Sequence, residues 1–289
     1  MTSNTQGIKI LLLGYKGLLG SALNQILTEK GVYCDRYDYP EIDANSNNPL
    51  SAIKTESYTH LINCIAYTDV NQAEVEYRKA IAVNTTFIRD LVHLCNEKGI
   101  CLVNISSSYI FDGSKKDDYL ENDPPNPINM YGITKYAGEM TVKQFCKYYL
   151  IIRTADLYGK SGIGKKSIVD RFVEMIQSGS DINVVNNEFT SPTYALTLAK
   201  QILLLIQNNV SGIYNATSMG RCNWLEFLEQ LKKRFPDSKS ELIPVSSDFF
   251  SGARKPLNGI LSKEKLVREG LCIMQDWQKD LDDYFCSIT

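Results

Sequence analysis

The sequence predicts an α/β fold, a Rossmann-type doubly wound parallel sheet with a smaller C-terminal α/β lobe. Three observations predict this fold class. Short apolar strands alternate with amphipathic helices from the N-terminus onward, as in parallel sheets that are buried on both faces. A glycine-rich turn joins the first strand to the first helix. After about residue 155 the regular alternation breaks into shorter, mixed elements, which indicates a second lobe.

The elements of the sheet follow in chain order. The apolar run 8–13 predicts the first strand, and residues 18–31 carry apolar side chains at helical spacing, with Gly31 as the stop signal. An amphipathic helix is predicted at 83–99. The other predicted strands are 32–37, 60–66, 100–106 and 149–153. The second half predicts a Gly/Lys loop at 159–166, a helix at 167–179, a strand at 182–185, a helix at 197–209 and a loop at 246–259.

Composition excludes several classes of function. The 289 residues carry a formal charge of −2, whereas a dedicated nucleic-acid binder usually has a basic excess. His60 and His93 are the only histidines, too few for a His-rich metal site, and the eight cysteines form no C-x-x-C pair. The sequence shows neither a signal peptide nor a run long enough to span a membrane, so we expect a cytoplasmic protein with no membrane partner.

The turn after the first strand spells G-x-x-G-x-x-G, with glycines at 14, 17 and 20. Backbone N–H groups and the positive end of a helix can hold a pyrophosphate at such a turn. Its candidate cofactor-binding residues are Gly14, Tyr15, Gly17, Leu18 and Leu19. We therefore expect residues 7–155 to form a NAD(P)-binding domain, completed by a strand and a helix from 182–215. The substrate-binding lobe would then comprise 156–181 and 216–289.

An acidic residue at the end of the second strand would bind the adenosine ribose. Asp35 and Asp38 both qualify, and Asp38 is favoured because it closes the strand before Pro40. A ribose-binding Asp favours NADH, whereas Arg36 could instead pair with the 2′-phosphate of NADPH. Both cofactors stay open on this reasoning.

Tyr131 and Lys135 form a Y-x-x-x-K pair that a helix would place on one face. The fourth strand ends in a serine triplet that includes Ser107, at the edge where doubly wound sheets bind ligands. A phenol has an ordinary pKa near ~10, so we expect the Lys135 ammonium and an oxidised nicotinamide to lower the pKa of Tyr131. Ser107, Tyr131 and Lys135 are the predicted catalytic residues, and this arrangement is that of a short-chain dehydrogenase/reductase.

Several longer segments are similar to the dTDP-4-dehydrorhamnose reductase family, which belongs to the extended short-chain dehydrogenases/reductases. These segments are LINCIAYTDVNQAE (61–74), SSSYIFDGSKKDDYLENDPPNPINMYGITKYAGE (106–139), RTADLYG (153–159), EFTSPTYALTLA (188–199), GIYNATSMGRCNWLEF (212–227) and ARKPLNGIL (253–261). The resemblance implies reduction of the 4-keto group of a nucleotide-diphosphate-linked 6-deoxysugar by NADPH or NADH, in a monomer or homodimer. It also implies further cofactor contacts at Ala66, Tyr67, Thr68, Asn84, Tyr131 and Lys135, and substrate contacts at Val70, Ser107, Tyr109, Tyr131, Asp156, Arg254 and Lys255.

The sequence departs from the family pattern at three positions that bear on function. Ser107 stands where the family has Thr, and it keeps the hydroxyl. Asp156 replaces a Trp that borders the sugar, and a carboxylate there favours a hydroxyl or an amino group on the substrate. Ala22 replaces an acidic residue that could serve a metal-bridged dimer, so no metal is expected.

Two other functions are weighed against reduction. An epimerase or dehydratase of the same superfamily would hold NAD tightly, but the triplet 106–108 lacks the Asp-Glu pair of the dehydratases. One branch of the family serves as a non-catalytic regulatory subunit of a methionine adenosyltransferase. The intact Ser107, Tyr131 and Lys135 favour a catalyst over that role.

Overall fold

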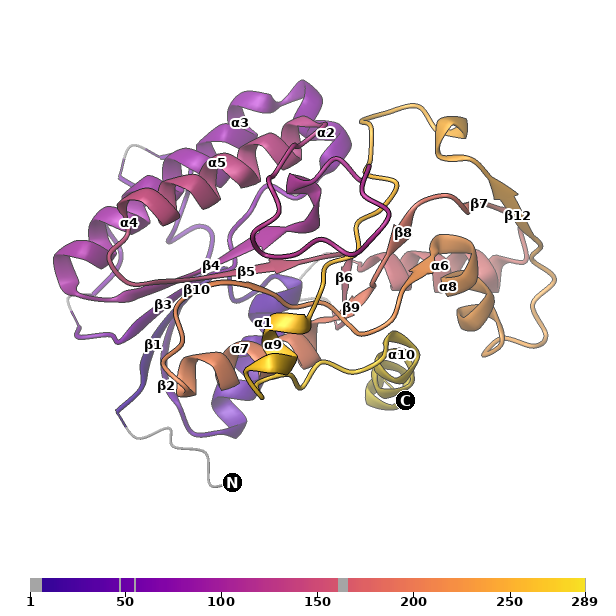
Figure 1. Ribbon diagram of the computed structural model, residues 1–289. Helices are drawn as coiled ribbons and strands as arrows, with labels where there is room; N and C mark the ends of the chain where they lie inside the picture. The colour runs from indigo at the N-terminus through magenta and orange to yellow at the C-terminus, as the bar shows by residue number, and fades with distance from the viewer. Residues whose placement is uncertain (1–6, 47, 55, 161–165, 289) are drawn as a thin grey trace.

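The computed structural model describes residues 7–46, 48–54, 56–160 and 166–288 and is built around a six-stranded sheet (Figure 1). The strand order is β10-β5-β4-β3-β1-β2, and every neighbouring pair is parallel. The strands are β1 (Lys9–Leu13), β2 (Tyr33–Tyr37), β3 (His60–Asn63), β4 (Cys101–Ser107), β5 (Tyr149–Thr154) and β10 (Gly212–Asn215). The predicted doubly wound parallel sheet is confirmed, and all five strands expected before residue 155 belong to it.

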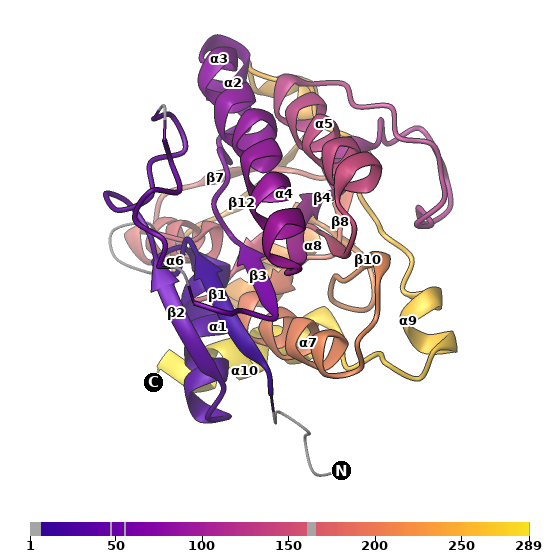
Figure 2. The same cartoon turned by 90° about the vertical axis from the view of Figure 1, so that its left-hand side faces the viewer.

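Helices cover both faces of this sheet (Figures 1 and 2). One face carries α2 (Val70–Val75), α3 (Tyr77–Ile81), α4 (Phe87–Lys98) and α5 (Met130–Phe145), and the other carries α1 (Leu18–Glu29), α7 (Ala195–Gln207) and α9 (Glu264–Arg268). Along β1 the side chains alternate between the two faces. Ile10 and Leu12 enter the core beneath α1 and α7, while Leu11 and Leu13 enter the core beneath α4. Burial on both faces is why this strand reads as a continuous apolar run.

The helix predicted at 83–99 differs in its first turn. Residues Ala82–Thr86 form a π-helical turn, and the regular helix α4 begins at Phe87. α2 and α3 precede this turn without having been predicted, because their sequences are short and mostly polar and carry no clear apolar stripe. Gly99 adopts a left-handed conformation and ends α4, as expected of a helix stop signal.

The smaller lobe has its own core. It comprises α6 (Ile168–Ser178), α8 (Trp224–Lys232), α10 (Trp277–Ile288) and three two-stranded pairs, and its core includes Tyr158, Phe227 and Trp277. The pairs are β7 (Ile182–Val185) with β12 (Leu242–Val245), β8 (Phe189–Thr190) with β11 (Cys222–Asn223), and β6 (Leu157–Tyr158) with β9 (Thr193–Tyr194). Of the predicted 159–166 loop, residues 161–165 lie outside the described residues.

Packing refines the expected division of the chain. Within 182–215, α7 and β10 complete the central sheet, whereas β7 pairs with β12 in the lobe. Leu266 and Met274, which belong to the segment assigned to the lobe, join the core beneath the central sheet. The C-terminal segment therefore passes from the lobe back to the nucleotide-binding side, where α9 contacts β10. Two short 3-10 turns, Ser108–Ile110 and Ser247–Phe249, complete the fold.

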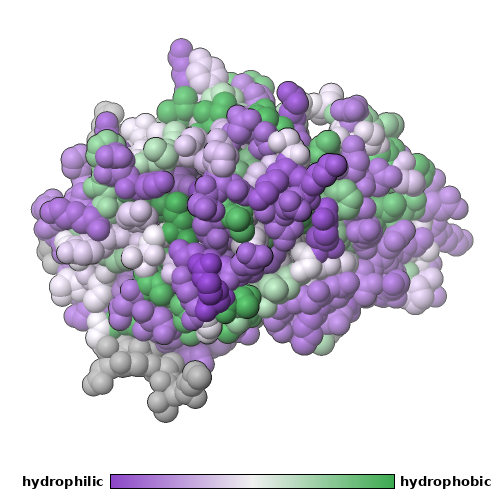
Figure 3. Space-filling view, viewed as in Figure 1, coloured by the Kyte–Doolittle hydropathy of each residue, from purple (hydrophilic) through white to green (hydrophobic). Residues whose placement is uncertain are grey.

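The surface in the view of Figure 1 is predominantly hydrophilic, with small hydrophobic areas scattered between charged and polar side chains (Figure 3). Within the described part of the chain, no helix has the length and apolar character needed to cross a membrane.

Candidate active site

The glycine turn lies between β1 and α1, at the carboxyl edge of the sheet. Gly14 has a φ of +77°, and a Cβ on it would lie 2.9 Å from the backbone nitrogen of Ile65. A Cβ on Gly20 would lie only 2.0 Å from the carbonyl oxygen of Gly14. Both positions therefore need glycine, one for its conformation and one for the close approach of helix and turn.

The N-terminus of α1 fits a pyrophosphate. Gly17 is the N-cap, so no side chain accepts a hydrogen bond from the first turn, and that turn contains no acidic residue. The backbone N–H groups of Leu18 and Leu19, together with the helix dipole, are left to bind an anion. These are features that a dinucleotide cofactor requires of such a turn.

Asp38 closes the same edge just after β2. Its carboxylate accepts hydrogen bonds from the backbone N–H groups of Lys16 (2.8 Å) and Tyr39 (2.8 Å). A hollow of about 200 Å³ beside the glycine turn is lined by Asp38, Ala66 and Tyr67, among others. The structure thus brings the favoured ribose-binding Asp together with two of the cofactor contacts that the resemblance implies.

The other two candidates on β2 turn away from this hollow. Arg36 binds the side chains of Asn24 and Thr28 on α1, and the carbonyl of Cys34 at 2.9 Å. Asp35 instead accepts a hydrogen bond from the hydroxyl of Tyr58 at 2.7 Å. The guanidinium of Arg36 is held on the flank of α1 here, and its pairing with a 2′-phosphate of NADPH stays a prediction.

Lys16 was not predicted as a site residue, but it lies beside Asp38. Its ammonium donates to the carbonyl of Tyr39 at 2.8 Å. The signal that could have identified it is its place in the glycine turn itself, where a cation faces the end of β2.

Asn84 connects the cofactor side of the edge to α5. It lies in the π-helical turn, is 3% exposed, and exchanges hydrogen bonds with the backbone N–H (2.9 Å) and carbonyl (3.0 Å) of Tyr67. Its amide also donates to the hydroxyl of Thr134 on α5 at 3.0 Å. Thr68 is exposed on the adjacent loop, and Val70 begins α2, which packs on α5. Asn84 therefore fixes the loop and the helix relative to one another.

Ser107 and Tyr131 meet at the end of β4. Burial raises the pKa of the Tyr131 phenol and the nearby charge of Asp156 raises it further, whereas the neighbouring Ser107 hydroxyl lowers it, and the net shift is upward. The ring of Tyr131 meets that of Tyr109 edge to face, with centroids 5.5 Å apart. The expected lowering of the Tyr131 pKa is thus absent in the chain by itself, because burial of the phenol outweighs the effect of its neighbours. A neutral phenol is a proton donor, which suits reduction.

Lys135 lies one turn further along α5 and is 7% exposed. Its ammonium donates to the carbonyl of Ile105 on β4 at 2.6 Å. Burial lowers the pKa of Lys135 to about 8, against the opposing charge of Glu139. The Y-x-x-x-K pair therefore shares one helix face at the sheet edge, as its spacing predicts.

A buried ion pair connects α5 to the central sheet. Arg153 on β5 and Glu139 on α5 are each 2% exposed, and the carboxylate accepts hydrogen bonds from Nε (3.1 Å) and Nη2 of the guanidinium. Glu139 also accepts from the hydroxyl of Ser106 at 2.8 Å, and Arg153 donates to the carbonyl of Glu121 at 2.9 Å. The pair joins α5 to β4 and β5 directly behind Ser107 and Lys135.

On the lobe side, Asp156 follows β5 and lies within electrostatic reach of Tyr131. Its charge raises the pKa values of both Tyr131 and Tyr109, and its carboxylate accepts a hydrogen bond from the hydroxyl of Thr190. Glu188, which was not predicted as a site residue, is 7% exposed and raises the pKa of Tyr109 as well. Lys255 is exposed, yet its charge lowers the pKa values of Asp156 and Glu188.

Arg254 lies next to Lys255 on the segment that crosses between the lobe and the sheet. Its carbonyl accepts a hydrogen bond from the side chain of Asn129, the N-cap of α5, at 2.8 Å. This contact anchors the segment with the predicted substrate contacts Arg254 and Lys255 to the helix that carries Tyr131.

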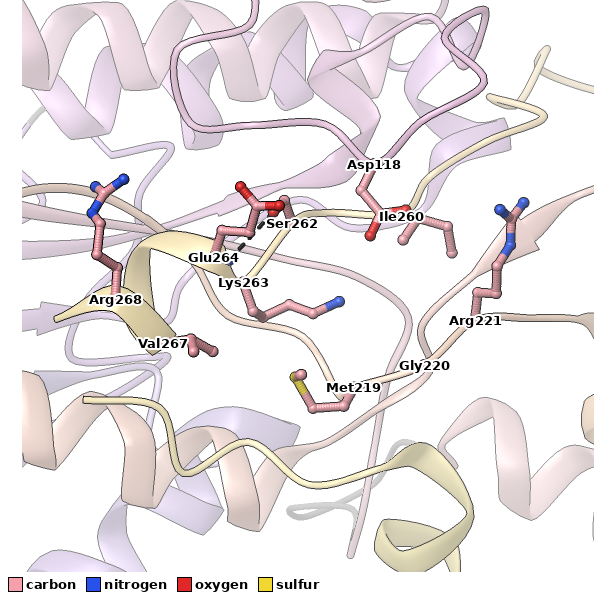
Figure 4. Close-up of a pocket in the computed structure, with 10 residues that line it drawn as sticks. All are labelled: Asp118, Met219, Gly220, Arg221, Ile260, Ser262, Lys263, Glu264, Val267 and Arg268. Atoms are coloured by element: carbon pink, nitrogen blue, oxygen red, sulfur yellow. Dashed lines mark hydrogen bonds between the residues drawn. The ribbon is translucent and has the colours of Figure 1, made fainter. Parts of the chain in front are cut away.

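A separate cavity of about 580 Å³ lies between α9 and the loop around Gly220 (Figure 4). Lys263 is 6% exposed and points into it, and Asp118 and Arg221 line it from other segments. Its described lining contains none of the predicted site residues. Within the described residues there is also no cluster of His, Cys, Asp or Glu that could hold a metal ion.

The doubly wound sheet, the uncapped glycine turn and the Ser-Tyr-Lys group at one edge define a short-chain dehydrogenase/reductase. The family described as the RmlD substrate binding domain matches residues 8–289, and the chain belongs to that family. The resemblance stated from the sequence is thereby confirmed.

Named relatives agree with this assignment over nearly the whole chain. A dTDP-4-keto-6-deoxy-D-glucose reductase of Streptomyces niveus is 30% identical over 280 residues, covering 95% of this chain and 96% of the relative. The dTDP-4-dehydrorhamnose reductase of Escherichia coli K12 is 28% identical, with 94% and 95% covered. The crystal structure of the Bacillus anthracis dTDP-4-dehydrorhamnose reductase in complex with NADP superposes with a TM-score of 0.90 at 30% identity, covering 97% and 99%.

Proposed function

We propose that this chain is an NAD(P)H-dependent oxidoreductase that reduces the 4-keto group of a nucleotide-linked 6-deoxysugar. The observation that carries the proposal is the placement of Ser107 at the end of β4, and of Tyr131 and Lys135 on α5, at the sheet edge that also holds the glycine turn, with Lys135 bound to the carbonyl of Ile105 on β4. Membership in the RmlD family and the names of the relatives support the same reaction class. The stretch from Gly14 to Leu19, together with Asp38, Ala66, Tyr67 and Asn84, would hold the cofactor.

A bound reduced nicotinamide supplies the hydride equivalent for the carbonyl carbon. Ser107 would donate a hydrogen bond to the carbonyl oxygen and fix its position. Tyr131 would transfer its phenolic proton to the same oxygen, so that the ketone becomes a secondary alcohol. Lys135 would contact the nicotinamide ribose with its ammonium, and the buried pair of Glu139 and Arg153 keeps α5 in place. The raised pKa of Tyr131 keeps the proton available for this step.

The test is a turnover assay with a panel of nucleotide-linked 4-keto-6-deoxysugars, dTDP-4-keto-6-deoxyglucose and dTDP-4-dehydrorhamnose first, each with NADPH and with NADH. Loss of the reduced-nicotinamide absorbance is expected with at least one substrate. Tyr131→Phe should lower kcat by roughly a hundredfold or more and leave cofactor affinity largely unchanged, because the variant loses only the phenolic hydroxyl that donates the proton. No turnover across the panel would refute the function, and full activity in the variant would refute the role of Tyr131.

The alternatives have less support. The UDP-glucose 4-epimerase of Thermus thermophilus superposes with a TM-score of 0.78, but at 18% identity this shows the fold alone. A purely regulatory subunit would not require Ser107, Tyr131 and Lys135 together at the sheet edge. Copurification with a methionine adenosyltransferase, together with an absence of reductase activity, would favour the regulatory role.

The cytoplasm is the proposed compartment, since Cys34, Cys95, Cys146 and Cys222 are buried thiols that form no disulfide. A monomer or a homodimer is the proposed state, to be measured by light scattering.

A further inference from the structure

The cavity between α9 and the loop around Gly220 contains none of the residues of the proposed active site (Figure 4). Backbone hydrogen bonds hold its walls in place. The N–H of Tyr119 donates to the carbonyl of Ile260 at 2.8 Å, and the N–H of Met219 donates to the carbonyl of Gln275 at 2.7 Å. Its volume of about 580 Å³ lies within the range of small-molecule sites. The lining comes from three parts of the chain, which are residue 118, the turn 219–221 and the segment 260–268.

Lys263 is the buried cation of this cavity. It directly precedes α9, is 6% exposed, and its side chain points into the cavity (Figure 4). Among the described residues its ammonium has neither a hydrogen-bond partner nor an ion-pair partner, so its three N–H donors are available to a bound molecule. Lys265, two positions further on, donates to the carbonyl of Ile213 at 2.8 Å and lies over the ring of Tyr214. The same segment therefore satisfies one lysine and leaves the other unpaired.

Burial without a partner is unfavourable for the charged form of Lys263. Burial lowers the pKa of its ammonium, and the charge of Asp118 opposes that shift. Asp118 is exposed and forms no ion pair with Lys263. An ammonium that is nine-tenths buried is costly to the fold unless an anion approaches it closely. The described part of the chain places no such anion at Lys263, which points to one that enters from solvent.

The rim of the cavity adds positive charge. Arg221 and Arg268 line it from opposite sides (Figure 4), and the guanidinium of Arg221 lies 4.8 Å from the ring centroid of Phe189. Both arginines are exposed, and neither forms an ion pair within the described part of the chain. Together with Lys263 they outnumber the two lining carboxylates, Asp118 and Glu264, so the lining carries a net charge of +1. The whole chain carries −2, so this excess of positive charge is local.

We propose that this cavity is a second ligand site, which binds a small organic anion through a carboxylate or phosphate group on the ammonium of Lys263. Both groups offer what Lys263 requires, a negative oxygen that accepts charge-assisted hydrogen bonds. Met219, Ile260 and Val267 supply an apolar lining against which the rest of the molecule would pack. The arginines of the rim favour the approach of anions. The site is independent of the reaction proposed at Tyr131.

The experiment is a calorimetric titration of the full chain with NADP⁺ present at saturation, so that the glycine turn is occupied and does not bind the probes. The probes are benzoate and phenyl phosphate, and the comparison compounds are neutral benzamide, acetate and inorganic phosphate. At least one aromatic anion should bind with a Kd of about 1 mM or below, and about tenfold or more tightly than each comparison compound. The tighter of the two probes then distinguishes a carboxylate ligand from a phosphate ligand.

Two variants and a labelling measurement locate the bound probe. Lys263→Met removes the ammonium and should weaken binding of the aromatic anion by about tenfold or more, whereas Lys143→Met, at an exposed position of α5, is the matched control and should leave binding unchanged. The Tm of Lys263→Met should be no lower than that of the wild type, because the variant loses a buried charge that has no partner. In the wild type, the probe should slow reductive methylation of Lys263, mapped by mass spectrometry, and leave that of Lys143 unchanged.

The possible outcomes separate clearly. If benzamide binds as tightly as the aromatic anions, or if neither anion binds, the inference is overturned. Equal affinity for acetate or inorganic phosphate would also overturn it, because the cavity would then hold an adventitious ion only. Binding that survives in Lys263→Met, or methylation of Lys263 that the probe does not slow, would place the probe elsewhere and refute the site. None of these measurements uses reductase activity, so this inference and the proposed function stand or fail separately.

Discussion

Replacing Gly20 by alanine tests whether the glycine turn is shaped by close packing. The added Cβ would lie 2.0 Å from the carbonyl oxygen of Gly14 and 2.7 Å from the Cα of Tyr15. A carbon–oxygen contact needs about 3.3 Å, so the helix and the turn must separate by about 1.3 Å. Both obstacles are backbone atoms, so no side-chain rotation can relieve the overlap.

The size of the effect follows from two opposing contributions. Overpacking against rigid backbone costs about 3 kcal/mol, while alanine in place of glycine inside α1 gains about 1 kcal/mol. The net loss is about 2 kcal/mol, which for a chain of this size lowers Tm by roughly 4–8 °C. NADPH affinity should fall as well, because the turn that receives the pyrophosphate is displaced.

Gly17→Ala is the matched control for this prediction. At Gly17 the φ is −72°, and a Cβ would meet the carbonyl oxygen of Gly14 at an ordinary 3.4 Å. Stability should change by less than about 1 kcal/mol, yet the methyl group occupies the space that the pyrophosphate needs, so NADPH affinity should fall tenfold or more. Thermal unfolding and a fluorescence titration with NADPH measure the two effects. A Gly20→Ala protein that melts like the wild type, or a Gly17→Ala protein that binds NADPH normally, would refute the reasoning.

Three further predictions concern buried charges. Glu139→Gln leaves the Arg153 guanidinium buried without its counterion and should cost about 3–5 kcal/mol, so an unchanged Tm in thermal unfolding would contradict the role given to this pair. Because the pKa of Lys135 is lowered to about 8, the ammonium is lost as pH rises through that value, and NADPH affinity should weaken between pH 7 and 9. Lys135→Met should bind NADPH weakly, with an affinity that does not change over this pH range. If its NADPH affinity fell with pH as that of the wild type does, Lys135 would be excluded as the source of the pH dependence. Burial raises the pKa of Glu188 above its unfolded value, so its folded carboxyl holds its proton more tightly and stability falls as pH rises through the raised pKa. Glu188→Gln should therefore raise the Tm of the cofactor-free protein more at pH 8 than at pH 5, and equal gains at the two pH values would contradict this.

Local patterns account for much of the fold. Five of the six strands of the central sheet could be placed from the sequence, most clearly from apolar runs such as 8–13, because a strand buried on both faces shows no polar alternation. The sixth, β10, was not placed individually. The π-helical turn before α4 and the two short helices before it could not, because their geometry follows from packing against α5 and not from their own sequence. The pairing of β7 with β12 also depends on distant residues, about 60 positions apart.

The candidate site likewise contains residues that local sequence signals predict and residues whose placement depends on the fold. The spacing of Tyr131 and Lys135 and the glycines of the turn are local signals, and the structure places them at one edge. Arg36 could not be judged from sequence, because its direction depends on the pleat of β2 and on partners in α1. Glu188 escaped notice because an isolated acid before a two-residue strand carries no pattern. Its burial, and the effect of the Asp156 charge on it, appear only in the folded structure.

The return of the C-terminal segment to the central sheet has a consequence for synthesis. Strand β10 and the core residues Leu266 and Met274 are among the last parts of the sheet to leave the ribosome. Until then β5 is an open edge strand, and the apolar surface beneath the sheet lacks part of its cover. An N-terminal fragment ending near residue 155 should aggregate instead of folding as a nucleotide-binding unit. The edge of β5 is therefore covered only once β10 and the segment around Leu266 and Met274 have been synthesised and have packed against the sheet.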